Sequence, residues 1–232
     1  MMNIALLGYG RMGQTIEKIA EDRGHKIVLK VDKNDGFTLE NIDVAIDFSI
    51  PQAAVHNIST CLKNNVPVVS GTTGWLEHYE EMTKLCKEND GAFLYASNFS
   101  VGVNIFFELN KQLAKMMQNV AGYNVTMEEI HHIHKLDAPS GTAITLAEGI
   151  MEHSKKTGWV LDQEVEDKIK IKAVREGEIP GTHSITYKSE VDEIKIEHKA
   201  HSRHGFALGA VLAAEWLHNK TGVYSMKDVL GL

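Results

Sequence analysis

The sequence predicts an α/β protein, in which a doubly wound parallel sheet domain is joined to an inserted α+β domain with an open mixed sheet. Short apolar stretches alternate with longer amphipathic ones over the first hundred residues, which predicts the doubly wound domain. Strand-like stretches then follow one another with few helices between them, which predicts the mixed sheet. We expect the first domain to comprise residues 1–100 and 204–232, and the second residues 101–203.

The expected strands of the first domain are apolar runs at residues 4–7, 26–31, 44–48, 66–69 and 92–96. The expected helices between them are residues 13–23, 51–64 and 76–88. Pro51 suits the first turn of its helix, because an N–H at that position has no partner within the helix. Apolar strands that alternate with helices indicate a parallel sheet covered on both faces.

The second domain is expected to hold strands at residues 125–133, 169–175, 184–188 and 193–200, with a hairpin turn at 190–193. Helices are expected at residues 104–117 and 141–153. Residues 206–218 are strongly apolar and predict a helix that returns to pack on the first domain. A half-apolar sheet with exposed edges also favours self-association through the second domain.

The composition is that of an ordinary soluble globular protein, with 43% apolar and 24% charged residues. The net charge of −7 argues against a broad nucleic-acid surface, because phosphate binding needs clustered Lys and Arg. The first apolar run is too short for a signal peptide or a membrane span, so we expect a cytoplasmic protein that binds no membrane. Cys61 and Cys86 lack the spacing of a disulfide framework or a zinc site.

Three glycines, at positions 8, 10 and 13, follow the first expected strand and open the first expected helix. In that context they are typical of a Rossmann-like dinucleotide site, where they allow a tight turn, a close pyrophosphate and close helix packing. The N-terminus of the helix adds N–H groups for the phosphates. The alternative is a glycine turn that binds no nucleotide. The residues expected to bind the cofactor here are Gly8, Tyr9, Gly10, Arg11 and Met12.

Asp32 ends the second expected strand, where a carboxylate can accept hydrogen bonds from the ribose hydroxyls of NADH. Lys33 beside it can instead attract the extra phosphate of NADPH, so the pair predicts use of either cofactor. A solvated loop is the alternative. The strand ends at residues 70–74 and 97–100 are small and polar, which suits a ligand crevice, and a simple capped turn is an equal alternative for each.

His131, His132 and Lys135 lie where an expected strand runs into a loop. Imidazole and amine groups can trade protons near neutral pH, so these residues are candidates for acid–base catalysis. Ser140 is expected to cap the following helix, whose first N–H groups, at Gly141 and Thr142, would bind an anion. The segment therefore predicts acid–base chemistry on a small acid.

A metal site is the main alternative for this segment, because three histidines and two glutamates lie within residues 128–134. The spacing matches no HExxH or comparable ligand pattern, so we predict no metal. Histidines solvated on a strand edge are the other alternative, and for His134 alone that interpretation is favoured.

With these residues in view, the chain resembles the dihydrodipicolinate reductase family, the 4-hydroxy-tetrahydrodipicolinate reductases of the diaminopimelate–lysine pathway. The resemblance runs nearly end to end and rests above all on residues 131–143. The other matching segments are residues 10–13, 47–49, 71–74, 98–104, 198–200, 202–203, 206–207 and 226–230.

The resemblance implies reduction of 4-hydroxy-tetrahydrodipicolinate to tetrahydrodipicolinate with loss of water, by NADH or NADPH. It implies acid–base roles for His131 and Lys135, and a homotetramer assembled through the inserted domain. The residues implied to bind the dicarboxylate substrate are His132, Lys135, Ser140, Gly141 and Thr142. Those implied to contact the cofactor near its nicotinamide are Gly71, Thr72, Thr73, Ser97, Asn98, Phe99 and Ser100.

Two other functions stay open at the level of the residues. One is a different nicotinamide-dependent dehydrogenase, acting on an amino or keto dicarboxylate. The other is a protein that senses NAD(H) without chemistry, although a sensor has no need of proton-handling groups beside an anion site.

Overall fold

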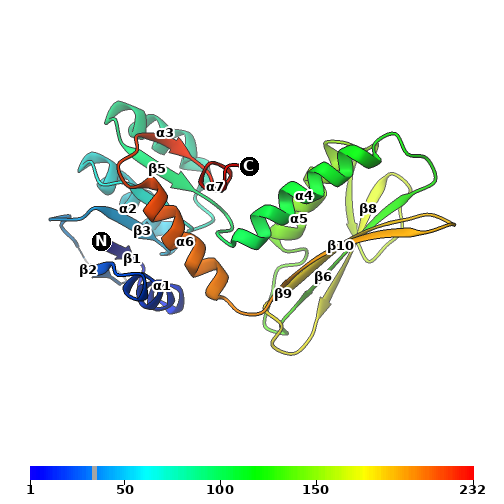
Figure 1. The fold of residues 1–232 in the computed structure, drawn as a ribbon, viewed down its shortest axis with the longest axis horizontal. Helices are drawn as coiled ribbons and strands as arrows, with labels where there is room; N and C mark the ends of the chain where they lie inside the picture. The colour runs from blue at the N-terminus through cyan, green and yellow to red at the C-terminus, as the bar shows by residue number, and fades with distance from the viewer. Residues whose placement is uncertain (33–35) are drawn as a thin grey trace. The chain divides into compact units, whose positions relative to one another are not determined.

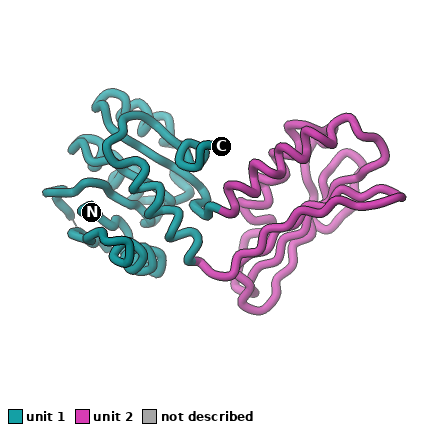
Figure 2. Tube along the Cα trace, in the orientation of Figure 1, with its two compact units in different colours: residues 1–101, 204–232 teal, residues 102–203 magenta. Residues whose placement is uncertain are grey.

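The computed structural model describes residues 1–32 and 36–232. The chain divides into two compact units (Figure 2): unit 1 is Met1–Val101 with His204–Leu232, and unit 2 is Gly102–Arg203. Each unit has its own sheet and its own apolar core. Unit 1 is therefore built from both ends of the chain, with unit 2 inserted between them. Among the described residues, no helix has the length and apolarity needed to cross a bilayer.

The sheet of unit 1 has six parallel strands in the order β11-β5-β4-β3-β1-β2. In chain order they are β1 (Asn3–Leu7), β2 (Lys26–Val31), β3 (Val44–Asp47), β4 (Val68–Ser70), β5 (Ala92–Tyr95) and β11 (Gly222–Tyr224). Strand β1 is buried on both faces, since Ile4 and Leu6 belong to one apolar core and Ala5 and Leu7 to the other. A central parallel strand covered on both sides is what the continuous apolar runs predict.

Helices cover both faces of this sheet (Figure 1). The core on one face includes residues of α1 (Arg11–Asp22) and α6 (His204–Leu217), and the core on the other includes residues of α2 (Pro51–Lys63) and α3 (Tyr79–Glu88). A short 3-10 helix, η1 (Leu76–His78), precedes α3, and α7 (Met226–Leu230) follows β11. The chain ends thus complete the doubly wound domain, which confirms the predicted fold class.

The sheet of unit 2 has five strands in the order β10-β9-β6-β8-β7. They are β6 (Asn124–His131), β7 (Gly158–Leu161), β8 (Lys168–Arg175), β9 (Gly181–Lys188) and β10 (Glu193–Ala200). The pairs β10–β9 and β9–β6 are antiparallel, whereas β6–β8 and β8–β7 are parallel, so the sheet is mixed, as predicted.

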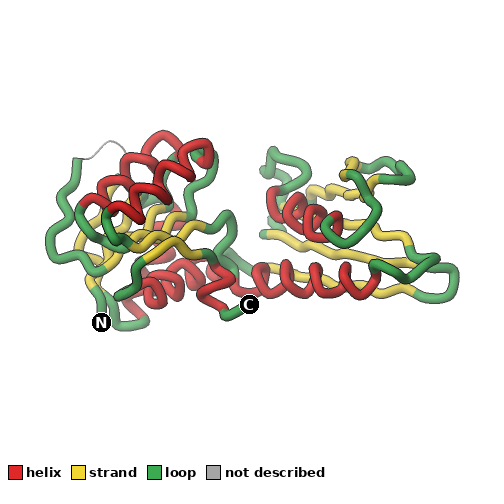
Figure 3. The backbone as a smooth tube through the Cα atoms, turned by 90° about the horizontal axis from the view of Figure 1, so that it is seen from above, coloured by secondary structure: helices red, strands yellow, loops and turns green. Residues whose placement is uncertain are grey.

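The core of unit 2 lies between this sheet and two helices (Figure 3), α4 (Val101–Met117) and α5 (Gly141–Met151). Residues Val125, Met127 and Glu129 of β6 are buried, whereas Thr126 and Glu128 between them are only partly covered. This alternation separates an inner face, which includes Glu129, from an outer polar face.

Two predicted strands, at residues 26–31 and 193–200, match β2 and β10 residue for residue. The strand predicted at 125–133 ends earlier, at His131. There its neighbour β8 ends and a turn begins: the Glu176 N–H donates to the His131 carbonyl (2.8 Å), and the Ile133 N–H donates to the Gly177 carbonyl (3.1 Å). Residues 132–135 then form a turn closed by the Lys135 N–H and the His132 carbonyl (3.1 Å).

The strand predicted at 184–188 begins earlier, at Gly181, so that Thr182 and His183 belong to β9. Three elements were not predicted: β7, β11 and α7. Strands β7 and β11 have four and three residues, all partly exposed, which gives them no clear apolar or alternating pattern.

Candidate active site

The glycine turn lies between β1 and α1. Gly8 has a φ of +99°, and a Cβ there would lie 2.2 Å from the Phe48 carbonyl oxygen. A Cβ at Gly13 would lie 2.4 Å from the Gly8 carbonyl oxygen. A Cβ at Gly10, the N-cap of α1, would meet no described atom within 4 Å, so space is open in front of the helix N-terminus. This arrangement fits a dinucleotide pyrophosphate, which needs close backbone approach at the start of a helix.

The other residues predicted for this part of the cofactor site are placed differently from one another. The Tyr9 hydroxyl donates a hydrogen bond to the Glu17 carboxylate, and the Lys30 ammonium lies 4.9 Å from the Tyr9 ring centre. Arg11 is exposed, and Met12 packs on the core. Asp32 is exposed just after β2. Lys33 lies outside the described residues.

A buried carboxylate, Asp47, organises the strand ends beside this turn. It accepts hydrogen bonds from Ser49 Oγ (2.6 Å), Asn57 Nδ2 (2.9 Å) and Ser70 Oγ (2.8 Å). Burial raises the pKa of Asp47, although these donors act to lower it. The Thr72 hydroxyl joins the network by accepting from the Ser49 N–H (2.9 Å). The network therefore fixes the end of β3 to α2 and to the segment that follows β4.

The predicted residues after β4 and β5 differ in how far they are buried. Gly71 packs against Phe48, since a Cβ there would lie 2.3 Å from the Phe48 ring, and Thr73 is exposed. Phe99 is buried in the core against Phe48, with ring centres 5.5 Å apart.

After β5, Ser97 is exposed, and Asn98 Oδ1 accepts from the Ser100 N–H (2.9 Å). Phe99 side-chain contact with a cofactor is therefore not supported by its position. Its neighbour Ser97 is exposed, and Asn98 is partly exposed.

In unit 2, Glu129, His131 and His183 gather on the inner face of the sheet, and all three side chains are buried. Glu129 Oε2 lies 3.7 Å from His131 Nδ1 and 3.8 Å from His183 Nε2. The two imidazole rings meet edge to face, with centres 5.0 Å apart. His131 Nδ1 is buried and has no hydrogen-bond partner among the described residues.

Electrostatics keep both histidines neutral at neutral pH. Burial lowers the pKa of His131, and the nearby cations Lys135 and Arg175 lower it further, whereas Glu129 acts to raise it. Burial lowers the pKa of His183 to about 4. A neutral imidazole can accept a proton, so His131 is suited to act as a base.

Lys135 lies in the loop after β6 and points its ammonium at Asp137, with Nζ 2.8 and 2.9 Å from the two carboxylate oxygens. Burial acts to raise the pKa of Asp137, but its hydrogen bonds with Lys135 and with its own backbone, together with the charges of Lys135 and Arg175, outweigh burial and lower the pKa. His132 is partly buried, whereas His134 is exposed and lies 3.3 Å from a carboxylate oxygen of Glu178. The predicted solvated position of His134 agrees with this placement.

Ser140 caps α5, as predicted: its hydroxyl accepts from the Ala143 N–H (3.2 Å). The same hydroxyl lies 3.1 Å from His183 Nε2, and Ser140 is only 3% exposed, so its side chain is already engaged within the protein. Gly141 is exposed, with open space around its Cα, and Thr142 follows it in the first turn of the helix. The start of α5 is therefore open to an anion at Gly141, because backbone N–H groups in a first turn have no acceptor within the helix.

The ligand atoms of Glu129, His131 and His183 all lie within 4.8 Å of one another, a spacing that a metal ion could bridge. Both oxygens of the Glu129 carboxylate already accept hydrogen bonds, from the Arg175 guanidinium and the Ser140 N–H. A guanidinium beside the carboxylate also supplies the positive charge that a metal would bring. We therefore assign no metal to this cluster.

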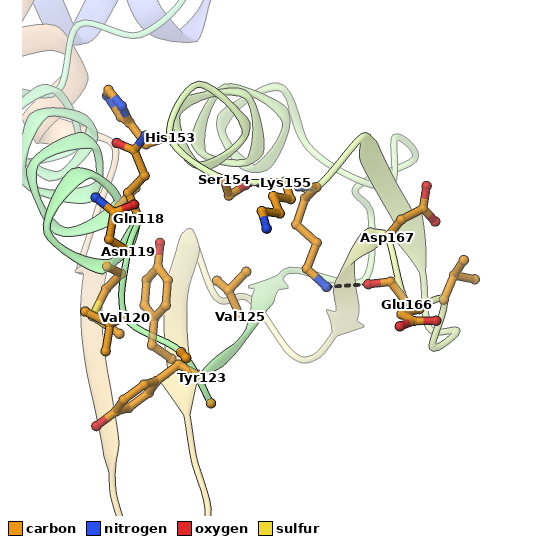
Figure 4. Close-up of a pocket in the computed structure, with 17 residues that line it drawn as sticks. Gln118, Asn119, Val120, Tyr123, Val125, His153, Ser154, Lys155, Glu166 and Asp167 are labelled. Carbon is orange, nitrogen blue, oxygen red and sulfur yellow. Dashed lines mark hydrogen bonds between the residues drawn. The ribbon is translucent and has the colours of Figure 1, made fainter.

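A hollow of about 830 Å³ lies elsewhere in unit 2 (Figure 4). It is lined by the end of α4, the residues after α5 and the segment before β8, and includes Tyr123, His153 and Glu166. None of the described residues predicted for substrate or cofactor lines it. The chemistry-bearing residues of unit 2 therefore lie apart from this hollow.

Sequence reasoning missed four residues that the structure places among the predicted ones: Asp137, Arg175, His183 and Asp47. Asp137 and Asp47 were given no part in the predicted site, Arg175 was only the end of an expected strand, and His183 lay outside the expected strand. Extending that strand by alternation would have put His183 on the same face as Ile185 and Tyr187.

Comparison with known proteins identifies the family. Models for the N-terminus and the C-terminus of dihydrodipicolinate reductase match residues 2–99 and 102–230. A 4-hydroxy-tetrahydrodipicolinate reductase of Christiangramia forsetii is 61% identical over 233 residues, which cover 99% of this chain and 98% of that protein. The chain belongs to the dihydrodipicolinate reductase family. It is accordingly a nicotinamide-dependent oxidoreductase that reduces 4-hydroxy-tetrahydrodipicolinate in the diaminopimelate route to lysine.

More distant relatives agree with this assignment. A 4-hydroxy-tetrahydrodipicolinate reductase of Methanoregula boonei is 34% identical over 96% of this chain and 95% of its own length. The fold matches a dipicolinate-bound dihydrodipicolinate reductase from Paenisporosarcina sp. TG-14 with a TM-score of 0.80, at 24% identity and 97% coverage of both chains. The two other functions left open by the residues, a different dicarboxylate dehydrogenase and a sensor without chemistry, are thereby set aside.

Proposed function

We propose that the chain carries out this reduction with Lys135 as proton donor and His131 as the base beside it. The observation that carries the proposal is that His131, Lys135 and the start of α5 lie on one short segment, which joins β6 to α5. A neutral imidazole, an ammonium and an anion-binding helix turn are the groups that a dicarboxylic imine needs.

The substrate binds with a carboxylate at the start of α5, where Gly141 and Thr142 form the first turn. His132 and Lys135 hold the ring from the loop side. Ser140 contributes as the cap that fixes this turn, because its own hydroxyl is buried.

Loss of water from the hydroxylated ring gives a conjugated imine. The nicotinamide, when bound, supplies the hydride that reduces it. Lys135 gives a proton to the atom on which negative charge develops, and Asp137 holds the ammonium in position until then. A positioned proton donor accelerates such a step by about 10²–10⁴-fold.

The nucleotide lies on unit 1, with its pyrophosphate at Gly10 and the N-terminus of α1. Gly8, Tyr9, Arg11 and Met12 surround that turn, and Asp32 receives the adenosine ribose. We propose that NADH and NADPH both serve, with Lys33 favouring NADPH. The nicotinamide end lies by the segments after β4 and β5: Gly71, Thr72, Thr73, Ser97, Asn98, Phe99 and Ser100.

A direct assay tests the function. Protein is mixed with NADH or NADPH and the freshly made condensation product of pyruvate and aspartate semialdehyde, and the loss of cofactor absorbance is followed. Consumption with both cofactors is expected, and dipicolinate, a planar ring dicarboxylate, should inhibit it competitively. No consumption with either cofactor would contradict the proposal.

We further propose a cytoplasmic homotetramer assembled through unit 2. Its support is the mixed sheet, whose edge strand β10 is largely exposed. Sedimentation of the purified protein should give four times the chain mass of 25.8 kDa. A monomer at micromolar concentration would contradict this assembly.

A further inference from the structure

The buried carboxylate of Glu129 contacts groups outside its own strand β6 that border the proposed catalytic segment. Glu129 is 0% exposed. Its Oε2 accepts from the Ser140 N–H (3.0 Å), and its Oε1 accepts from the Arg175 guanidinium (3.0 Å). The first contact holds the cap of α5, and the second leads to the loop that carries Lys135.

Arg175 connects Glu129 to that loop. Besides Glu129, its guanidinium donates to the backbone carbonyls of Lys135 (3.3 Å) and Asp137 (2.6 Å). It also donates to the carbonyl of Val174 in its own strand (2.9 Å). The planar guanidinium of Arg175 thus joins the end of β8 to the Glu129 carboxylate on β6 and to the loop at Lys135 and Asp137.

We propose that Glu129 is a positioning residue of the active site. Its carboxylate fixes the start of α5 through Ser140 and the Lys135 loop through Arg175, and so holds His131, Lys135 and the anion-binding turn in one geometry. The proposal rests on the functions proposed above for His131 and Lys135.

The hydrogen bonds explain why a carboxylate is needed at this position. Both oxygens face donors, and an ionised carboxylate accepts at both. A glutamine accepts at only one oxygen and turns its amide N–H groups toward the other donor. Two donors would then face each other in a buried site, which costs more than the loss of one hydrogen bond.

The charge of Glu129 also acts on His131. The charged or titratable groups that face His131 are Glu129 itself, His183 on β9, Arg175 on β8, and Lys135 and Asp137 in the loop. Burial and the cations lower the pKa of His131, and Glu129 opposes them. Removing the carboxylate should therefore shift the titration of His131 to lower pH.

The test compares Glu129→Gln with Glu128→Gln. Glu128 is the neighbouring residue on the outer face of β6, where it lies 2.8 Å from Lys172 Nζ. For Glu129→Gln we expect kcat to fall by about 10²-fold, since small displacements of reacting groups have effects of that size. The acidic limb of the kcat–pH profile and the His131 ring-proton titration by NMR should move to lower pH. Glu128→Gln should leave kcat, its pH profile and the His131 titration unchanged.

Two results would overturn the inference: an unchanged kcat in folded Glu129→Gln, or a lower kcat with unmoved pH profile and His131 titration. If Glu129→Gln does not fold, the variant Arg175→Lys is measured instead. Lysine keeps the positive charge but lacks the planar guanidinium, so kcat should fall while His131 titrates nearly as in the wild type. A wild-type kcat in Arg175→Lys would refute the proposal. Because the NMR titration needs no substrate, a wild-type chain inactive in the assay would contradict the proposed function without deciding the role of Glu129.

Discussion

At the scale of single residues, Lys135 is the side chain on which turnover should depend most directly. Its side chain is only 22% exposed, and its ammonium donates to both oxygens of Asp137. Lys135→Ala should lower kcat by about 10²–10⁴-fold, because the proton donor is lost. Steady-state kinetics would measure this, with Lys84→Ala, an exposed lysine of α3, as the control. Wild-type turnover in Lys135→Ala would remove Lys135 from the mechanism.

His183 should make the stability of unit 2 sensitive to pH. Its pKa is about 4 in the folded protein and near its ordinary value, about 6.5, in the unfolded chain. Between these values the unfolded chain binds more protons, so the free energy of unfolding decreases as pH falls from about 6.5 towards 4. His131 contributes in the same direction.

His183→Gln should therefore show a shallower pH dependence than the wild type over that window, by up to about 1.4 kcal/mol per pH unit. Hydrogen exchange of the β6 and β9 amides would report it. Equal slopes for the two proteins would mean that His183 is protonated in the folded state.

Two of the residues that sequence reasoning missed, Arg175 and His183, share a physical cause. Glu129 and Arg175 are 46 residues apart, and Ser140 and His183 are 43 apart, so only the pairing of β6 with β8 and β9 brings them together. Local patterns predict which residues share a strand face, but not which strands become neighbours. His131, Lys135 and Ser140 could be predicted because they lie on one continuous segment.

At the scale of elements, two glycines of the glycine turn have different roles: Gly13 is needed for packing, and Gly10 leaves room for the cofactor. Gly10 has open space where a Cβ would lie, whereas a Cβ at Gly13 would meet the Gly8 carbonyl oxygen at 2.4 Å. Gly10→Ala should fold normally but raise the Kd for NADH by about tenfold, which corresponds to about 1.4 kcal/mol. Gly13→Ala should lose about 1–3 kcal/mol of stability, as overpacked sites do.

Thermal melts and fluorescence titrations with NADH would distinguish the two variants. Tight NADH binding by a folded Gly10→Ala protein would place the pyrophosphate elsewhere.

The strands and helices around this turn were predictable because their apolar period is regular, whereas short elements such as β11 have too few residues to show a period.

At the scale of the whole molecule, unit 1 depends on the segment that returns after unit 2. Residues Ala207, Ala210, Val211, Ala214 and Leu217 of α6 are fully buried in its core. A Cβ at Gly209 would lie 1.7 Å from the Phe99 carbonyl oxygen, so α6 packs directly on the segment after β5. A chain that ends at Arg203 should therefore lose NADH binding, although it keeps the entire glycine turn. If the truncated chain bound NADH as tightly as the full chain, this account would be contradicted.

The insertion of unit 2 also orders events during synthesis. The strands β1 to β5 leave the ribosome first, but the apolar face that α6 covers and the edge of β5 that β11 pairs with stay open until the chain is nearly complete. At translation rates of about 5–20 residues per second, unit 2 takes on the order of ten seconds to emerge. The nascent chain therefore exposes this apolar face and this strand edge for that interval. Unit 1, whose synthesis begins first, is the domain that is completed last.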